Sequence, residues 1–103
     1  KIVARFKQSV LNEQKRQEAV IQYDIDEYDE RLLRHLALGY TKDMITNLKG
    51  IPFGVKSLEK RQNDLINRFF ATDERGGVNA TRLVVRAFEL GVLTIDNLEP
   101  DEE

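Results

Sequence analysis

The sequence contains no cysteine and no tryptophan, and it has only one histidine and two prolines. Without cysteine, the chain can form neither a disulfide framework nor a zinc site with thiolate ligands. No apolar run approaches the ~18 residues of a membrane-spanning helix, and no charged-then-apolar leader resembles a signal peptide. These absences predict a cytoplasmic protein that holds no metal or other cofactor and contacts no membrane.

Residue patterns typical of catalysis are also missing. The single histidine, His35, lies between apolar residues, which favours a partly buried structural role. Residues 24–30 hold five carboxylates but lack the ligand spacing and central glycine of a calcium-binding loop. No GxxxxGK[ST] phosphate loop and no nucleophile–base pair is present. We therefore predict that the protein is not an enzyme and has no small-molecule substrate.

Charge is unevenly distributed along the chain. Residues 1–41 are balanced, residues 42–86 hold nine basic and five acidic side chains, and residues 87–103 hold six acidic and no basic ones. A basic middle segment suits a surface that faces phosphate groups. A mixed, solvated surface explains the same counts, so charge alone leaves both interpretations open.

The first half of the chain predicts two helices. Residues 2–21 contain no glycine or proline, but residues 12–18 are entirely polar, which favours a linker helix over a sustained coiled coil. Asp26, followed by Asp29, is typical of a capped helix start, and Gly39 is typical of a helix end. The buried stripe expected for this second helix consists of Leu32, Leu33 and Leu36.

The second half predicts a short helix, a turn and two longer helices. Thr41 is expected to cap a helix over residues 42–48, in which Met44, Ile45 and Leu48 face inward. Two glycines and a proline make residues 49–54 a turn. Residues 55–70 then show one apolar face at helical spacing. The apolar face consists of Leu58, Leu65, Ile66 and Phe69.

A loop over residues 72–80 precedes the last predicted helix, residues 81–90, and residues 99–103 are expected to be a disordered acidic end. Every periodic segment is helical. The predicted fold is therefore all-α: a compact helix-turn-helix bundle of about four helices over residues 25–95. A linker helix in residues 1–24 precedes it, and an acidic tail, residues 96–103, follows it. The three tyrosines are expected to pack inside the bundle.

Residues 25–93 resemble the LuxR/NarL-type helix-turn-helix domain found at the C-terminus of many two-component response regulators. Three stretches carry the resemblance through their order and spacing. Residues 31–45, RLLRHLALGYTKDMI, resemble the first helix, the turn and the scaffold helix. Lys56-Ser57-Leu58, followed by the apolar positions of the next helix, resembles the recognition helix. Residues 87–93, AFELGVL, resemble the closing helix.

The resemblance implies sequence-specific binding of double-stranded DNA by a transcriptional regulator that acts as a homodimer. Residues 1–24 would then be the tether from an upstream phosphoacceptor domain. The implied base contacts are Glu59, Lys60 and Asn63. The implied phosphate contacts are Thr41, Lys42, Lys56, Ser57 and Arg61. The implied dimer contacts on the last helix are Leu83, Val84, Ala87 and Phe88.

The sequence departs from the family at three places. The turn 49–54 and the loop 72–80 are longer than usual, and Glu59 stands where lysine is common. A carboxylate repels phosphate, although it can accept a hydrogen bond from the amino group of cytosine. These departures and the acidic tail motivate a second hypothesis. The chain could be a helical protein–protein interaction module that retains the fold without DNA binding.

Overall fold

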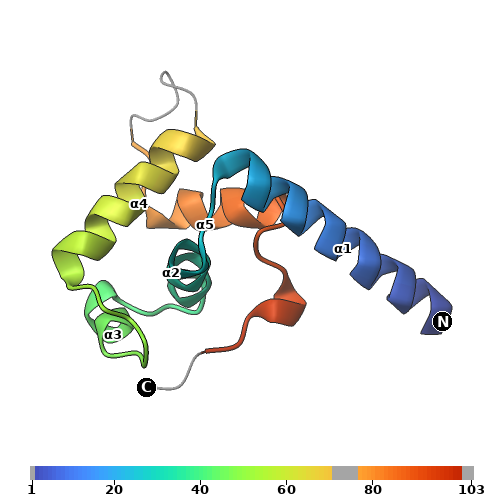
Figure 1. The fold of residues 1–103 in the computed structure, drawn as a ribbon, viewed down its shortest axis with the longest axis horizontal. Helices are drawn as coiled ribbons and strands as arrows, with labels where there is room; N and C mark the ends of the chain where they lie inside the picture. The colour runs from blue at the N-terminus through green and yellow to red at the C-terminus, as the bar shows by residue number, and fades with distance from the viewer. Residues whose placement is uncertain (1, 71–76, 101–103) are drawn as a thin grey trace.

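The computed structural model describes residues 2–70 and 77–100 of the chain, with side chains from residue 13 onward. Five α-helices and one short 3₁₀ helix follow one another, and the described ranges contain no strand, which confirms the all-α prediction (Figure 1). The elements are α1 (Ile2–Tyr23), α2 (Glu27–Ala37), α3 (Lys42–Thr46), α4 (Val55–Phe69), α5 (Ala80–Glu89) and η2 (Ile95–Asn97). No helix in this part of the chain is both long and apolar enough to cross a lipid bilayer.

Helix α2 is central to the bundle because it packs against α3, α4 and α5 (Figure 1). Of its predicted buried stripe, Leu32 and Leu33 are fully buried, and Leu36 is half-buried against the core. Each neighbouring helix contributes fully buried leucine or isoleucine side chains to the same core, and the segment after α5 adds two more apolar residues. These additional core residues are Ile45, Leu58, Leu65, Leu83, Val92 and Leu93.

The N-terminal helix points away from the bundle over most of its length (Figure 1). Its last turn, however, packs on the core: Ala19 is buried, and the ring of Tyr23 meets Phe69 edge-on with centroids 5.1 Å apart. Asp24, in a left-handed conformation with φ of 54°, then turns the chain into α2. The end of the predicted linker therefore shares its core with the helix-turn-helix bundle.

Helix ends follow the expected chemistry. Asp26 and Asp29 form a capping box at the start of α2. Gly39, with φ of 90°, ends that helix in the left-handed conformation that glycine adopts readily. The Thr41 hydroxyl caps α3 by accepting a hydrogen bond from the Met44 amide. These three signals were all predicted and are confirmed.

Three predictions about packing need correction. Met44 is 44% exposed rather than inward, because α3 is one short turn and only Ile45 and Leu48 reach the core. His35 is fully buried, not partly, and its Nδ1 lies 2.7 Å from the Arg31 carbonyl oxygen. The third correction concerns residues 99–103, which were expected to be disordered: the backbone carbonyl of Glu99 accepts a hydrogen bond from Arg34. Residues 72–76 of the predicted loop and residues 101–103 of the predicted tail lie outside the described part of the chain.

All three tyrosines pack against other aromatic rings, as expected. Besides the Tyr23 contact, Tyr28 meets Phe53 edge-on with centroids 5.0 Å apart, and Tyr40 meets His35 at the same distance. Tyr28 joins the start of α2 to the turn before α4. This contact matters for the site described next.

Candidate nucleic-acid interface

The helix predicted to read DNA is a single uninterrupted helix of 15 residues, α4. Its apolar face is buried against the bundle through Leu58, Leu65, Ile66 and Phe69. Because an α-helix has 3.6 residues per turn, a buried stripe of this kind leaves the opposite face open to solvent. The short helix α3 packs against α4, and residues 47–54 connect the two helices.

All three residues predicted to contact bases are exposed on α4. Glu59, Lys60 and Asn63 lie within one helical turn of one another, so they can share one surface. Lys56 and Ser57, two of the predicted phosphate contacts, are also exposed, in the first turn of the same helix.

Thr41 and Lys42, the other predicted phosphate contacts outside α4, lie at the start of α3. Thr41 is exposed and Lys42 is half-buried. All eight predicted DNA-contacting residues thus lie at exposed or half-buried positions of α4 or of the start of α3. One of them, Arg61, has a different environment.

The start of α4 carries no local negative charge. Its N-cap residue, Gly54, makes no side-chain hydrogen bond, and the first turn contains no acidic residue. The first amide N–H groups of a helix lack partners within the helix and carry a partial positive charge. With Lys56 and Ser57 beside them, these groups form a surface that favours an anion such as a phosphate.

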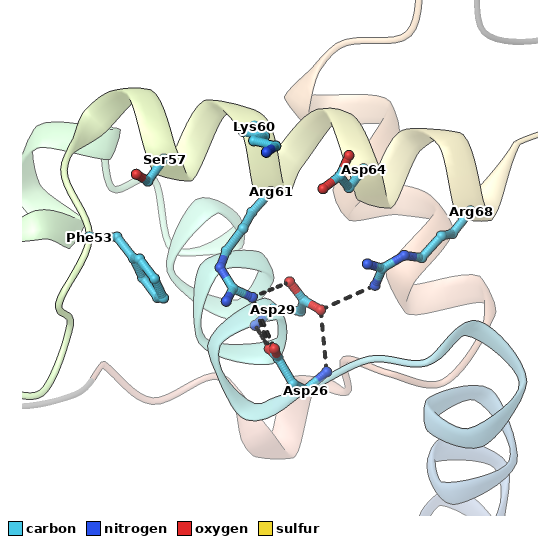
Figure 2. Close-up of a pocket in the computed structure, with 8 residues that line it drawn as sticks. All are labelled: Asp26, Asp29, Phe53, Ser57, Lys60, Arg61, Asp64 and Arg68. Atoms are coloured by element: carbon cyan, nitrogen blue, oxygen red, sulfur yellow. Dashed lines mark hydrogen bonds and ion pairs between the residues drawn. The ribbon is translucent and has the colours of Figure 1, made fainter.

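Arg61 is held by two carboxylates from the start of α2 (Figure 2). Its Nη1 lies 3.0 Å from Asp26 and 2.9 Å from Asp29. The guanidinium also lies over the ring of Phe53, 4.4 Å from the ring centre, and within 5.4 Å of the Tyr28 ring centre. Arg61 therefore faces the body of the protein, and its charge is compensated there.

Asp29 is the buried member of this group, with only 3% of its surface exposed. Besides Arg61, it accepts a hydrogen bond at 3.3 Å from Nη1 of Arg68, which also donates to the Asp24 carbonyl. The Asp26 amide donates to the same carboxylate and completes the capping box. We call Asp26, Asp29, Arg61 and Arg68 the α2–α4 charge cluster.

The charges within the cluster stabilise one another. Burial alone raises the pKa of the Asp26 carboxyl. The hydrogen bonds from the Asp29 amide and from Arg61, with the positive charge of Arg61, outweigh burial and hold this pKa below its usual value. For Arg61, burial lowers the pKa, and hydrogen bonds to Asp26 and Asp29 raise it above the usual value. Both side chains are therefore charged at neutral pH.

A cavity of about 330 Å³ opens beside the cluster between α2, α4 and the preceding turn (Figure 2). Three basic and three acidic side chains line it, so the cavity as a whole is electrically balanced. Its lining consists of Asp26, Asp29, Phe53, Ser57, Lys60, Arg61, Asp64 and Arg68.

The structure changes how the charge along the sequence should be counted. Arg61 and Arg68 belong to the basic segment 42–86, but their partners Asp26 and Asp29 lie outside it. Sequence windows could not reveal this pairing. The one signal was the spacing of the two arginines, seven residues apart and therefore on one face of a helix.

The predicted dimer contacts are wrong for two of four residues. Leu83 and Ala87 are fully buried in the core because the face of α5 that carries them packs on α2 and α4. Val84 and Phe88 are half-buried against the same core. The exposed apolar residue of α5 is Val85, 53% exposed, which the sequence did not single out.

Among the described residues, no three histidine or acidic side chains come close enough to hold a metal ion. The described part of the chain is a small all-α bundle in which a short helix, a turn and a long amphipathic helix follow one another. The profile of a family of unknown function, DUF5932, matches residues 1–103, so the chain belongs to this family. No curated protein and no solved structure matches the chain.

Proposed function

We propose that this chain binds double-stranded DNA in a sequence-specific manner, as the effector domain of a transcriptional regulator of the response-regulator type. The observation that carries the proposal is the geometry of α4. It is one continuous helix, its apolar face is buried, and Lys60 and Asn63 are exposed on it. A helix of this kind fits the major groove of B-form DNA and can present side chains to base edges.

The exposed side chains match the chemistry of base edges. Lys60 can donate to the O6 and N7 atoms of guanine, and Asn63 can pair with adenine through its amide group. Glu59 can accept a hydrogen bond from the amino group of cytosine, which turns its departure from the related family into a sequence preference.

Phosphate contacts come from the two helix starts that flank the turn. Thr41 and Lys42 begin α3, and Lys56 and Ser57 lie in the first turn of α4 beside its uncapped amides. Such contacts supply affinity and fix the protein on the duplex, while base contacts supply specificity. We leave Arg61 out of this set because its Nη1 is bound to two carboxylates.

Selection from a pool of random duplexes tests the proposal. We expect one sequence to be enriched, and Lys60→Ala to relax the preference at one position by about 1–3 kcal/mol. Lys42→Ala should weaken binding to all duplexes alike. Lys15→Ala, on exposed α1, is a control with the same change of charge and should leave binding unchanged. No enrichment at low salt would contradict the proposal.

We also propose that two copies associate through the exposed side of α5. Arg82 lies three residues before Val85, and Glu89 lies four residues after it. In an antiparallel pair of α5 helices that cross at Val85, Arg82 of one copy therefore lies opposite Glu89 of the other. All three are exposed. Two recognition helices related by a two-fold axis would read a palindromic site.

The charge cluster is the observation that favours the alternative, a protein–protein interaction module. The charges of Arg61 and Arg68 are compensated by Asp29. The remaining charged residues of α4 are two acidic and two basic ones, so the exposed face has no net positive charge. They are Glu59, Asp64, Lys56 and Lys60. A protein partner, rather than a duplex, would then dock on this face. In that case the duplex pool would give no enrichment, and Glu59→Ala would weaken the association with the protein partner.

A further inference from the structure

We infer that Arg61 is a positioning residue, which sets the orientation of α4 and of the turn before it, and does not itself contact DNA. Through Asp29 and Phe53, Arg61 joins three segments: the start of α2, the turn 49–54 and α4. This inference rests on the proposed function for its consequence. Its structural part can be tested without DNA.

The attachment of α4 to α2 has two points. Arg61 and Arg68 are seven residues apart, which is about two helical turns and about 10 Å along the helix axis. Both donate to the one carboxylate of Asp29, which is 3% exposed. Two anchors that converge on a buried acceptor restrict both rotation of α4 about its axis and sliding along it.

The turn is attached through the same arginine. Phe53, one residue before the N-cap of α4, lies under the Arg61 guanidinium at 4.4 Å, and Tyr28 meets the Phe53 ring edge-on. The long turn is thus fixed to α2 at its last residues. This contact explains how a turn longer than in the related family can still define where α4 begins.

Rotation of α4 would directly affect the exposed face. Neighbouring residues on an α-helix are about 100° apart around the axis. Because Arg61 points to the protein body, Lys60 (Figure 2) and Asn63 stay exposed to solvent. If Arg61 lost its partners, α4 could rotate about its axis. Lys60 and Asn63 would then no longer face the DNA in the orientation that the proposed base contacts require.

The rival interpretation is that Arg61 contacts a DNA phosphate, as the family resemblance implies. The two roles predict opposite signs for the affinity of Asp29→Asn for the selected duplex. Removal of the carboxylate would release a phosphate-binding arginine and tighten binding. If the cluster positions α4, binding to the selected duplex would instead weaken about tenfold, the size of one good base contact, and sequence discrimination would fall with it. Asp96→Asn, an exposed carboxylate on η2, is the control with the same change of charge.

Two milder variants keep the test valid if Asp29→Asn does not fold. Arg61→Lys preserves the charge, so a phosphate contact would survive. Arg61 reaches both carboxylates through Nη1 while its guanidinium lies over the Phe53 ring. A lysine has no guanidinium plane, so its ammonium cannot keep both carboxylate contacts and the stacking contact at once. Phe53→Leu removes the stacking ring and changes no charge. If Arg61 positions α4, both variants should prefer the selected duplex over other duplexes about tenfold less strongly than the wild type does, which is the size of one base contact. Arg16→Lys is the matched control, because Arg16 is a half-buried arginine of α1 whose Nη1 lies 3.8 Å from Glu13.

Hydrogen exchange of the DNA-free protein separates this inference from the proposed function. Amides of residues 51 and 58–62 should exchange faster in Arg61→Lys and Phe53→Leu than in the wild type and in Arg16→Lys. Unchanged exchange in both variants would overturn the positioning role, as would tighter DNA binding by Asp29→Asn. If the wild type selects no duplex, the proposed function fails, and the exchange rates alone decide whether Arg61 positions α4.

Discussion

Asp29 is a carboxylate buried at the start of α2, and its burial requires compensation. Removing an ion from water costs several kcal/mol unless its oxygens are hydrogen-bonded and a counter-charge is close. Asp29 has two guanidinium groups and one backbone amide as donors. An aspartate in an exposed ion pair would contribute little to the stability of the fold. Because Asp29 is buried, loss of its partners would destabilise the fold strongly.

The neighbouring carboxylate predicts how stability depends on pH. The pKa of Asp26 is lower in the folded protein than its usual value of about 3.9. A group with a lowered pKa contributes stability above the unfolded pKa, and this contribution is lost as the pH falls through the folded pKa. We therefore expect the contribution of Asp26 to be complete at neutral pH, to begin to fall as the pH approaches about 4, and to be lost as the pH falls further through the lower folded pKa.

The variant Asp26→Asn isolates this effect, because asparagine is as good an N-cap as aspartate. At pH 7 the variant should be slightly less stable than the wild type in urea unfolding. The difference should shrink as the pH falls to about 3. The expected size is small, because the Asp26 side chain is 53% exposed and solvent screens its ion pair. A difference that stays constant over this pH range would contradict the assignment.

At the scale of the elements, α5 begins at a single polar cap. The Asn79 side chain accepts a hydrogen bond from the Arg82 amide at 3.0 Å and is exposed, so it has no packing role. Asn79→Ala should lower the free energy of unfolding by about 1 kcal/mol, and Asn79→Ser should leave it nearly unchanged, since serine caps equally well. Urea unfolding of the two variants checks this, and equal stability of both would show that the cap contributes nothing.

Which elements could be predicted from the sequence follows from the range of the forces involved. The capping box of Asp26 and Asp29, the end at Gly39 and the cap at Thr41 act within four residues, and the sequence predicted all three. The buried stripe of α4 was also predicted, because helical periodicity is local.

The remaining features depend on contacts between distant segments. Asp26 and Arg61 are 35 residues apart, so nothing local indicated that this arginine is compensated. On α5, apolar side chains surround more than one face, and only packing shows that Leu83 and Ala87 are buried while Val85 is exposed. The candidate site was therefore predicted as residues of α4 and of the start of α3, but not as a helix that the charge cluster holds against α2.

At the scale of the whole molecule, the proposed dimer gives a direct test. Val85→Asp places a charge at the centre of the proposed α5 contact and should shift the protein to a monomer in analytical ultracentrifugation. Ile95→Asp is a matched control, because Ile95 is an exposed apolar residue on η2, outside α5. If both variants retain the association state of the wild type, the dimer contact lies elsewhere.

The salt dependence of DNA binding reports how many cations of the assembled protein reach phosphates. The logarithm of the binding constant falls with the logarithm of salt concentration by about 0.9 for each phosphate neutralised. Lys42 and Lys56 are the charged members of the proposed phosphate set, because Arg61 and Arg68 are compensated by Asp29. Two contacts per protomer predict a slope of about −4 for a dimer and about −2 for a monomer.

The same titration distinguishes a cluster that stays intact on DNA from one that opens. If both arginines left Asp29 to bind phosphates, four contacts per protomer would give a slope of about −7 for a dimer. The measurement is a set of binding curves for the selected duplex between 50 and 200 mM salt, a range of about fourfold in concentration over which such slopes are resolved. We expect the shallower slope, because opening the cluster would leave a buried carboxylate without its partners, at a cost of about 3–5 kcal/mol. A solvent-exposed ion pair contributes about 0.2–1 kcal/mol. Two exposed phosphate contacts would therefore not offset that cost, and the intact cluster is the state in which α4 should meet DNA.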